Sequence, residues 1–329
     1  MATLQDVVEP ETAGDPMSGQ KWVRSSLREV SRRLTEVGHP ASPPTVGRLL
    51  KALGYALRVN AKKVDAKAAH PDRSAQFDSI ARQREQFQAA GLPIISVDTK
   101  KKELVGNFKN AGRAWSQVAD AVNVHDFPQD ALGRAVPYGI YNLTHNCGTV
   151  YLGQSADTPR FAVAMIARWW STDGRAAFPE ADQLLVLADA GGSNGCRPRL
   201  WKQQLQEQLS DRFGLSVTVC HYPTGCSKWN PIEHRLFGPI SLNWAGQPLR
   251  TWETLLGWIR GTKTTTGLQV QAELHTGVYP TGESVSDAVM ATLNLERHAV
   301  CPAWNYTIRP HHPGTFAPPA QLLDRELVS

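Results

Sequence analysis

The sequence has 329 residues, of which 41% are hydrophobic, and it carries a net charge of +5 with histidine neutral. This length allows two domains with a sizeable core. No apolar run approaches the roughly 20 residues that cross a bilayer, which excludes a membrane-spanning protein, and the acidic N-terminus does not resemble a secretory signal. Five cysteines without CxxC spacing favour free thiols in a reducing cytoplasm over a disulfide framework or a zinc site.

The charge is unevenly distributed along the chain. Residues 1–19 carry four acidic residues and no Lys or Arg, whereas residues 20–90 contain 14 Lys and Arg against 6 Asp and Glu. A basic segment of domain size points to a polyanion, with phosphate contacts supplying most of the affinity. A solvated helical face with surplus basic residues would give the same composition, so the charge alone does not decide.

Within the basic segment, the apolar spacing predicts a helix-turn-helix of the winged type. Apolar residues recur at helical spacing from Val23 to Val37, where Gly38 ends the helix. A second helix is predicted from Ser42 to Gly54, and residues 55–59 alternate like a strand. The second helix would enter a DNA groove, although many helical hairpins bind nothing. The candidates for DNA contact are Thr45, Arg48 and Lys51 on this helix and Arg58, Lys62 and Lys63 in the wing.

Residues 71–92 predict a helix that links this module, residues 20–70, to a core that begins at Pro93. The core opens with a short apolar strand that ends in Asp98. The basic, polar run that follows includes Lys100 and Lys101, which could contact DNA near a cut. Residues 138–141 and 149–152 then predict a hairpin, which with the first strand would form the antiparallel start of a sheet.

A second carboxylate follows the apolar run Leu184–Leu187, which predicts a buried strand. The strand ends in Asp189 and a Gly-rich loop at residues 190–195. An Asp at the carboxyl end of a buried strand is where open α/β sheets place ligand and metal groups. The same residue could instead cap the next helix. The loop lacks the spacing of a phosphate-binding loop.

A third carboxylate lies in the stretch His221–Phe237. Asn230 and Pro231 predict a helix start, as N-cap and first helical residue, and Glu233 falls in the first turn. Glu233 could simply cap this helix. Its neighbours Lys228 and Arg235 are candidate phosphate contacts, although a solvated surface role fits them equally well.

The three carboxylates thus lie on three separate elements, each at a strand end or a helix start. Two divalent metal ions need hard oxygen ligands from elements that can converge, with coordination left for water and phosphate. We therefore interpret Asp98, Asp189 and Glu233 as a candidate site for two ions of Mg²⁺ or Mn²⁺.

Three segments also resemble a known family. SVDTKKKELVGNFKNAGR, LLVLADAGGSNG and HYPTGCSKWNPIEHRLF followed by NWAGQPL are similar to the DDE transposases of bacterial insertion sequences, in particular the Rhodopirellula type, which are distantly mariner-like. The resemblance runs from about Val8 to Ile308. It implies an α/β fold with an RNase H-like DDE catalytic domain at 93–310, of order βββαβαβα, preceded by an all-α helix-turn-helix DNA-binding module and followed by a tail at 311–329. The DDE triad would be Asp98, Asp189 and Glu233.

The resemblance further implies a bacterial enzyme, cytoplasmic and associated with the nucleoid, that binds double-stranded DNA at transposon ends. It would catalyse metal-dependent cleavage and strand transfer as a homo-oligomer. Asp98 would bridge the two metal ions, and Asp189 and Glu233 would each hold one. One alternative is a catalytically idle or truncated copy that acts only as a DNA-binding protein or repressor, and another is an RNase H-like nuclease that does not transpose. The segments 272–282 and 304–308 are expected to form loops that flank the site.

Overall fold

The computed structural model describes residues 2–8, 12–14, 21–23, 25–55, 70–113 and 117–312. The chain divides into two compact units, Met1–Ala66 and Lys67–Ser329.

The first unit is a small helical cluster. Its elements are α1 (Ala2–Val8), β1 (Thr12–Gly14), β2 (Lys21–Val23), α2 (Leu27–Glu36) and α3 (Pro43–Ala52), with β1 and β2 antiparallel. Five buried side chains from the three helices form its core: Leu4, Val8, Val30, Leu34 and Val46. The acidic N-terminal segment is therefore built into this unit through α1, because Leu4 and Val8 contribute to the same core as the two predicted helices.

Both predicted helices of the basic segment are present. The Ser26 hydroxyl accepts from the Glu29 N–H at the start of α2, and Ser42 caps α3 in the same way. The first helix begins at this cap and not at Val23, which lies in β2. Gly38, after α2, has a positive φ of 78°, the conformation that favours glycine at a helix end. The predicted wing, with Arg58, Lys62 and Lys63, lies outside the described residues.

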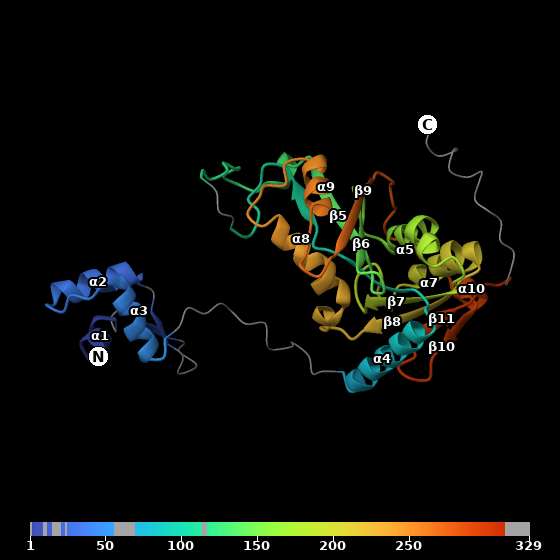
Figure 1. Ribbon diagram of the computed structural model, residues 1–329, viewed down its shortest axis with the longest axis horizontal. Coiled ribbons are helices and arrows are strands. Elements are labelled where there is room, and N and C mark those ends of the chain that lie inside the picture. The colour runs from blue at the N-terminus through green and yellow to red at the C-terminus, as the bar shows by residue number, and fades with distance from the viewer. Residues whose placement is uncertain are drawn as a thin grey trace. The chain divides into compact units, whose positions relative to one another are not determined.

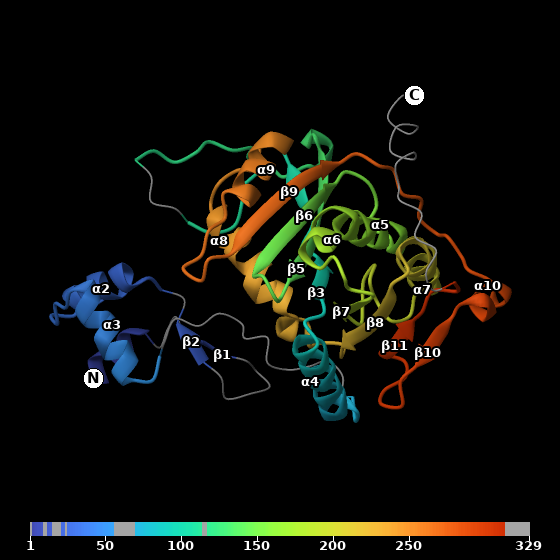
Figure 2. The same ribbon diagram turned by 45° about the vertical axis from the view of Figure 1, so that its right-hand side comes forward.

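The second unit is built on a nine-stranded mixed sheet (Figures 1 and 2). Its strands are β3 (Ile94–Thr99), β4 (Glu103–Val105), β5 (Gly133–Asn142), β6 (Cys147–Gly153), β7 (Gln183–Asp189), β8 (Ser216–Tyr222), β9 (Gln269–His275), β10 (Leu295–Arg297) and β11 (Asn305–Ile308). The order is β10-β11-β8-β7-β3-β5-β6-β9, and β4 pairs with β5. In the central five strands, β5 is antiparallel to β3 and β6, while β7 and β8 run parallel to β3. This is the predicted RNase H-like arrangement.

Helices cover both faces of this sheet. The helices described in the second unit are α4 (Arg73–Ala89), α5 (Pro159–Trp169), α6 (Arg175–Ala177), α7 (Arg199–Leu205), α8 (Gly238–Asn243), α9 (Trp252–Arg260) and α10 (Asp287–Thr292). Shorter or wider helical turns are η2 (Pro128–Asp130), η3 (Trp170–Gly174), η4 (Gln206–Asp211), η5 (Ser227–Trp229) and η6 (Glu233–Phe237). Within the ranges described above, no helix is long and apolar enough to span a bilayer.

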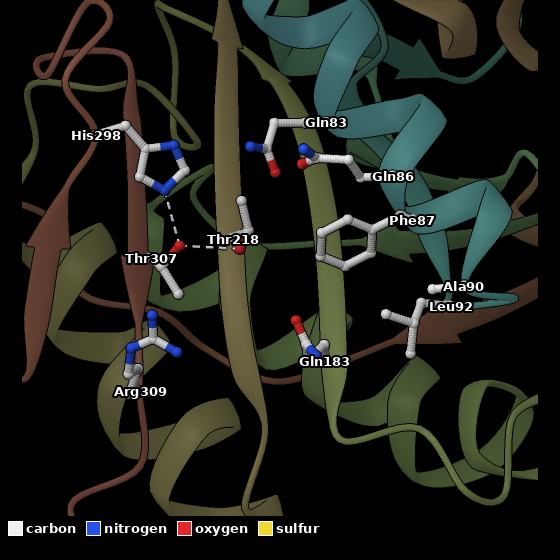
Figure 3. A pocket seen from close by; sticks show the side chains of 10 residues that line it. All are labelled: Gln83, Gln86, Phe87, Ala90, Leu92, Gln183, Thr218, His298, Thr307 and Arg309. Atoms are coloured by element: carbon white, nitrogen blue, oxygen red, sulfur yellow. Dashed lines mark hydrogen bonds between the residues drawn. The ribbon is translucent and has the colours of Figure 1, made fainter.

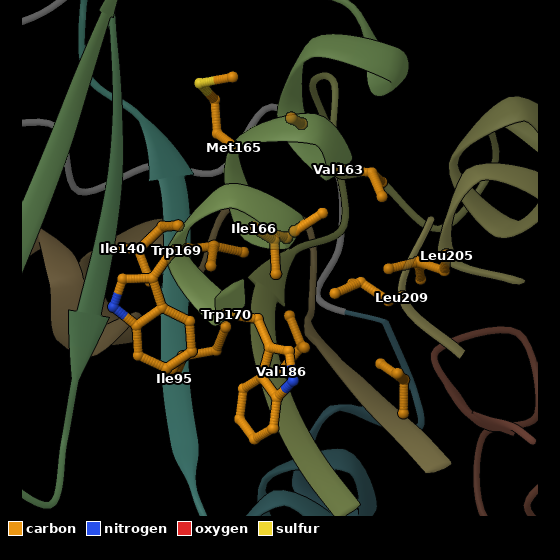
Figure 4. Packing of buried hydrophobic residues seen from close by; sticks show 14 of the residues in the cluster. Ile95, Ile140, Val163, Met165, Ile166, Trp169, Trp170, Val186, Leu205 and Leu209 are labelled. Atoms are coloured by element: carbon orange, nitrogen blue, oxygen red, sulfur yellow. The ribbon is translucent and has the colours of Figure 1, made fainter. Parts of the chain in front are cut away.

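The main core lies between the sheet and α5, α7 and η4. Figure 4 shows Trp169 and Trp170 in this core, with Ile166 of α5 and Val186 of β7. Adjacent residues on a helix point in different directions, but both tryptophans are almost fully buried because the sheet and the turn η3 enclose them together. This packing fixes the strands whose carboxyl ends carry the aspartates.

The predicted linking helix, α4, belongs to the second unit. Ile80 and Phe87 pack against Leu185 and Leu187 of β7 on the opposite face from α5. Phe87 lines a hollow of about 320 Å³ together with Gln83, Gln86, Thr218 and Thr307. Figure 3 shows these side chains. The buried Gln76 amide donates to the backbone oxygen of His221 at 2.8 Å. The core therefore begins with α4, before Pro93.

Two segments that were expected to form loops are strands instead. β9 pairs parallel with β6, and β11 pairs antiparallel with β8, so both extend the sheet. The expectation of loops at 272–282 and 304–308 is therefore wrong for residues up to His275 and for Asn305–Ile308. The predicted tail from 311 starts with an ordered contact, since the His311 N–H donates to Asp211 Oδ1 at 2.9 Å. Residues 313–329 lie outside the description.

Candidate active site

Asp98 and Asp189 end two neighbouring parallel strands. Val97 of β3 is in register with Ala188 of β7, so the next residue on each strand is an aspartate. Side chains alternate between the faces of a strand. Asp98 therefore shares a face with Ser96, and both aspartates point to the face that α4 and the Glu233 helix cover.

The Glu233 helix lies directly on the sheet beside Asp98. Gly139 of β5 is the register partner of Asp98, and a Cβ atom there would lie 2.5 Å from the Phe237 ring. A Cβ at Gly148 of β6 would similarly collide with Leu236. These two glycines leave room for the helix, and its close approach brings Glu233 to the strand ends.

Gly139→Ala is expected to lower the free energy of unfolding by roughly 1–3 kcal/mol, because Phe237 and the helix must shift to admit the methyl group. The substitution should also displace Glu233 from the two aspartates, since Glu233 moves with the helix. Urea denaturation measures the change in stability. Gly257→Ala is the control, because a Cβ at that position meets no atom within 4 Å. Equal stability of the two variants would contradict this account.

Asn230 connects all three elements of the site. It is fully buried, and its NH₂ group donates to Asp189 Oδ1 at 3.2 Å and to the Val97 carbonyl at 3.4 Å. Its oxygen accepts from the Ser96 hydroxyl, whose oxygen in turn accepts from the Ile232 N–H at 3.0 Å. Asn230 was expected to cap the helix with its side chain. Ser96 does so instead, and Asn230 orients Asp189.

Burial raises the pKa of all three carboxylates, and neighbouring carboxylates add to the shift of Asp98 and Asp189. Burial and the nearby Asp189 raise the pKa of Asp98 to about 8. Burial raises the pKa of Asp189 to about 6, with a smaller contribution from Glu233. Burial also raises the pKa of Glu233, against the opposing charge of Lys100. Clustered carboxylates with raised pKa values are typical of functional sites.

The donor set fits a hard divalent cation. Among the described residues, no three His, Cys, Asp or Glu side chains form a ready-made ligand cluster. The three carboxylates nevertheless supply the oxygen ligands that Mg²⁺ and Mn²⁺ prefer, and their mutual repulsion is what a cation would neutralise. Asn194, in the loop after Asp189, favours the charged form of Asp98. Its buried Nδ2 has no hydrogen-bond partner among the described residues, so it can donate a hydrogen bond to a polar atom of a ligand.

The predicted DNA contacts near the site differ in how exposed their side chains are. Lys101 is 83% exposed, and Lys228 and Arg235 are also exposed. Lys100 is only 9% exposed, pairs with Glu103 at 3.3 Å and lies over the Trp244 ring at 4.4 Å. This burial leaves the Lys100 ammonium little surface for a DNA contact, and its charge acts on Glu233.

In the first unit, α3 carries the other predicted contacts. Arg48 and Lys51 are exposed. Thr45 is half-buried, and its hydroxyl bonds with Ser42 at 3.0 Å and with Arg48 at 3.3 Å. Thr45 therefore has a local role at the helix start as well.

A buried histidine supports Asp189 from behind, a role that the sequence analysis did not identify. His221 Nδ1 donates to the Asp189 carbonyl at 3.0 Å, and Nε2 accepts from the Tyr306 hydroxyl at 3.0 Å. Trp201 Nε1–H in turn donates to the Tyr306 oxygen at 2.8 Å. Burial lowers the pKa of His221 to about 4, so the ring is neutral. The available signal was a histidine within the buried strand of residues 216–222.

The sheet topology, with aspartates ending two adjacent parallel strands and a glutamate on a following helix, is the arrangement expected for an RNase H-like domain. Residues 3–310 match the family model of the Rhodopirellula transposase DDE domain. The chain belongs to this family and is a DDE transposase, which confirms the resemblance seen in the sequence.

Solved structures with a similar chain include the "Mos1 transposase paired-end complex with left transposon end" and the "Crystal structure of the Mos1 mariner paired end complex with Mn". Each is 13% identical, covers 78% of this chain and 69% of its own chain, and has a TM-score of 0.42. No curated protein matches the sequence.

Proposed function

We propose that Asp98, Asp189 and Glu233 are the catalytic carboxylates of this transposase and hold its divalent metal ions, Mg²⁺ or Mn²⁺. The supporting observation is that two aspartates end adjacent strands in register, with Asn230 joining one of them to the helix that carries Glu233. The metal, when bound, would activate water and stabilise the leaving oxygen of a phosphodiester.

The chain's own residues orient these ligands. The Thr99 N–H donates to Asp98 Oδ1 at 2.8 Å, and Asn230 holds one oxygen of Asp189. Lys100 offsets the negative charge of Glu233. A 3′-hydroxyl freed by cleavage would occupy the same site when it attacks target DNA, so no protein nucleophile is needed.

The basic residues of the first unit would bind transposon ends, with residues 20–70 as the DNA-binding module and residues 71–310 as the catalytic part. Arg48, Lys51 and Thr45 on α3 would contact one groove. Exposed Lys101, Lys228 and Arg235 would contact phosphates near the carboxylates. Strand transfer requires two paired ends, so the working form would be a homo-oligomer on DNA, in the cytoplasm at the nucleoid.

The test is cleavage of a duplex that carries the flanking repeat of the protein's own locus, with Mg²⁺ or Mn²⁺. We expect nicking at the repeat end in wild type and a loss of at least about 10³-fold in Asp189→Ala and Glu233→Ala, because each removes a metal ligand. Glu180→Ala, at an exposed turn, is the control. Repeat binding without cleavage in either metal would instead support an idle DNA-binding copy.

A further inference from the structure

A partly exposed tryptophan lies immediately before the Glu233 helix. Trp229 is 53% exposed and ends the turn η5. Hydrogen bonds within the turn fix its backbone: the Trp229 N–H donates to the Cys226 carbonyl at 2.8 Å, and the Asn230 N–H donates to the Ser227 carbonyl at 2.9 Å. Tryptophan has a large apolar ring that is usually mostly covered. An open indole on a hydrogen-bonded turn is therefore a candidate contact for a ligand.

Trp229 belongs to a row of two aromatic rings with a cation at each end, which we call the aromatic ladder: Arg73, Phe77, Trp229 and Lys228. Phe77 of α4 meets Trp229 edge-on at 6.0 Å between ring centroids. Lys228 Nζ lies 5.4 Å from the Trp229 ring centroid, and the Arg73 guanidinium lies 5.9 Å from that of Phe77. Neither cation has an ion-pair partner in the part of the chain that the structure describes.

The ladder is joined to the catalytic carboxylates through short, bonded connections. Asn230 follows Trp229 directly, and its amide donates to Asp189 at 3.2 Å. The carbonyl of Lys228 bonds with the ring of His234, the residue after Glu233. A ligand bound to the aromatic ladder would therefore lie next to the position at which the carboxylates act.

Aromatic rings stack on any base, and flanking cations hold the phosphates, which is the way proteins bind single-stranded nucleic acid. A base inside a duplex has no free face for such stacking. We propose that the aromatic ladder is a subsite for an unpaired nucleotide next to the scissile phosphate of DNA. The proposal rests on the proposed function, because the carboxylates define where that phosphate lies.

The test measures binding of the full chain without divalent metal, so it does not depend on catalysis. Two DNA duplexes of the flanking repeat are compared, one blunt and one with a short single-stranded overhang at the cleavage position. Trp229→Ala should weaken binding of the overhang duplex by about tenfold or more, as expected for one lost base stack, and leave the blunt duplex within about twofold. Trp229→Phe should restore most of the loss. Leu242→Ala, at another exposed apolar position on α8, is the control.

A second measurement locates the contact. Photo-crosslinking of 5-bromouracil in the overhang should label the peptide that contains Trp229, in wild type and in Glu233→Ala alike. Wild type that crosslinks but does not cleave the repeat duplex once Mg²⁺ or Mn²⁺ is added would refute the catalytic proposal and keep the subsite. Equal losses on both duplexes, no loss on either, or no binding of the overhang by wild type would overturn the subsite. If sedimentation shows that Trp229→Ala changes the oligomeric state, the surface binds a second copy of the chain. That result would also overturn the nucleotide subsite.

Discussion

Asp98→Asn is expected to stabilise the metal-free protein while abolishing cleavage. Burial and Asp189 raise the pKa of Asp98 to about 8, so between about pH 4 and pH 8 the folded state binds more protons than the unfolded state. Stability is therefore lost as the pH rises through that window. The substitution removes this cost, which is on the order of 2–4 kcal/mol at pH 7. The amide oxygen can still accept from the Thr99 N–H, and the NH₂ group would face the other carboxylates.

The measurement is urea denaturation in EDTA at pH 5 and pH 8, followed by the same series in Mg²⁺. The difference between Asp98→Asn and wild type should grow with pH in EDTA. Mg²⁺ should stabilise wild type more than the variant, because a ligand that binds only the folded state adds to its stability. Asp78→Asn, at an exposed position on α4, should change neither quantity. If the variant is less stable than wild type at pH 8, burial and the charge of Asp189 do not destabilise the Asp98 carboxylate.

The positions of the three carboxylates could be predicted from the sequence because their signals are local. An apolar run that ends in an aspartate marks a strand end within a few residues, and Asn230-Pro231 marks a helix start. β9 was missed because Gln269–His275 is largely polar at the edge of a sheet, although Val270, Ala272 and Leu274 do alternate. Alternation in so polar a segment was a weak signal for a strand.

The contacts that support the site could not be predicted, because their partners are distant in sequence. Ser96 and Asn230 are 134 residues apart, and His221 and Tyr306 are 85 apart. Nothing in either local pattern specifies the other residue. The burial of Lys100 could not be predicted for the same reason: its charge is visible in the sequence, but Trp244, against which it packs, comes from a segment after Glu233.

His221→Asn is expected to make the free energy of unfolding depend less on pH under acidic conditions. Burial lowers the pKa of His221 to about 4, and Lys202 adds repulsion, so the unfolded state binds more protons than the folded state between about pH 4 and pH 6.5. Stability is therefore lost as the pH falls through that window, by about 2–3 kcal/mol at pH 4.5. The raised pKa values of Asp98 and Asp189 act in the opposite sense there, so only the comparison of variant with wild type isolates the histidine.

At pH 7 the variant should be less stable than wild type, because the Tyr306 hydroxyl loses its acceptor and the core loses part of a ring. The deficit should shrink by about 2–3 kcal/mol at pH 4.5, since only wild type then has a buried imidazole to protonate. Urea denaturation at the two pH values measures this, with His125→Asn at an exposed position as control. A constant deficit would mean that His221 takes up its proton at the same pH in the folded and the unfolded state, so that burial does not lower its pKa. Below that pH its Nε2 would donate to Tyr306, and a positive charge would lie behind Asp189, which would reverse the electrostatic account of the site.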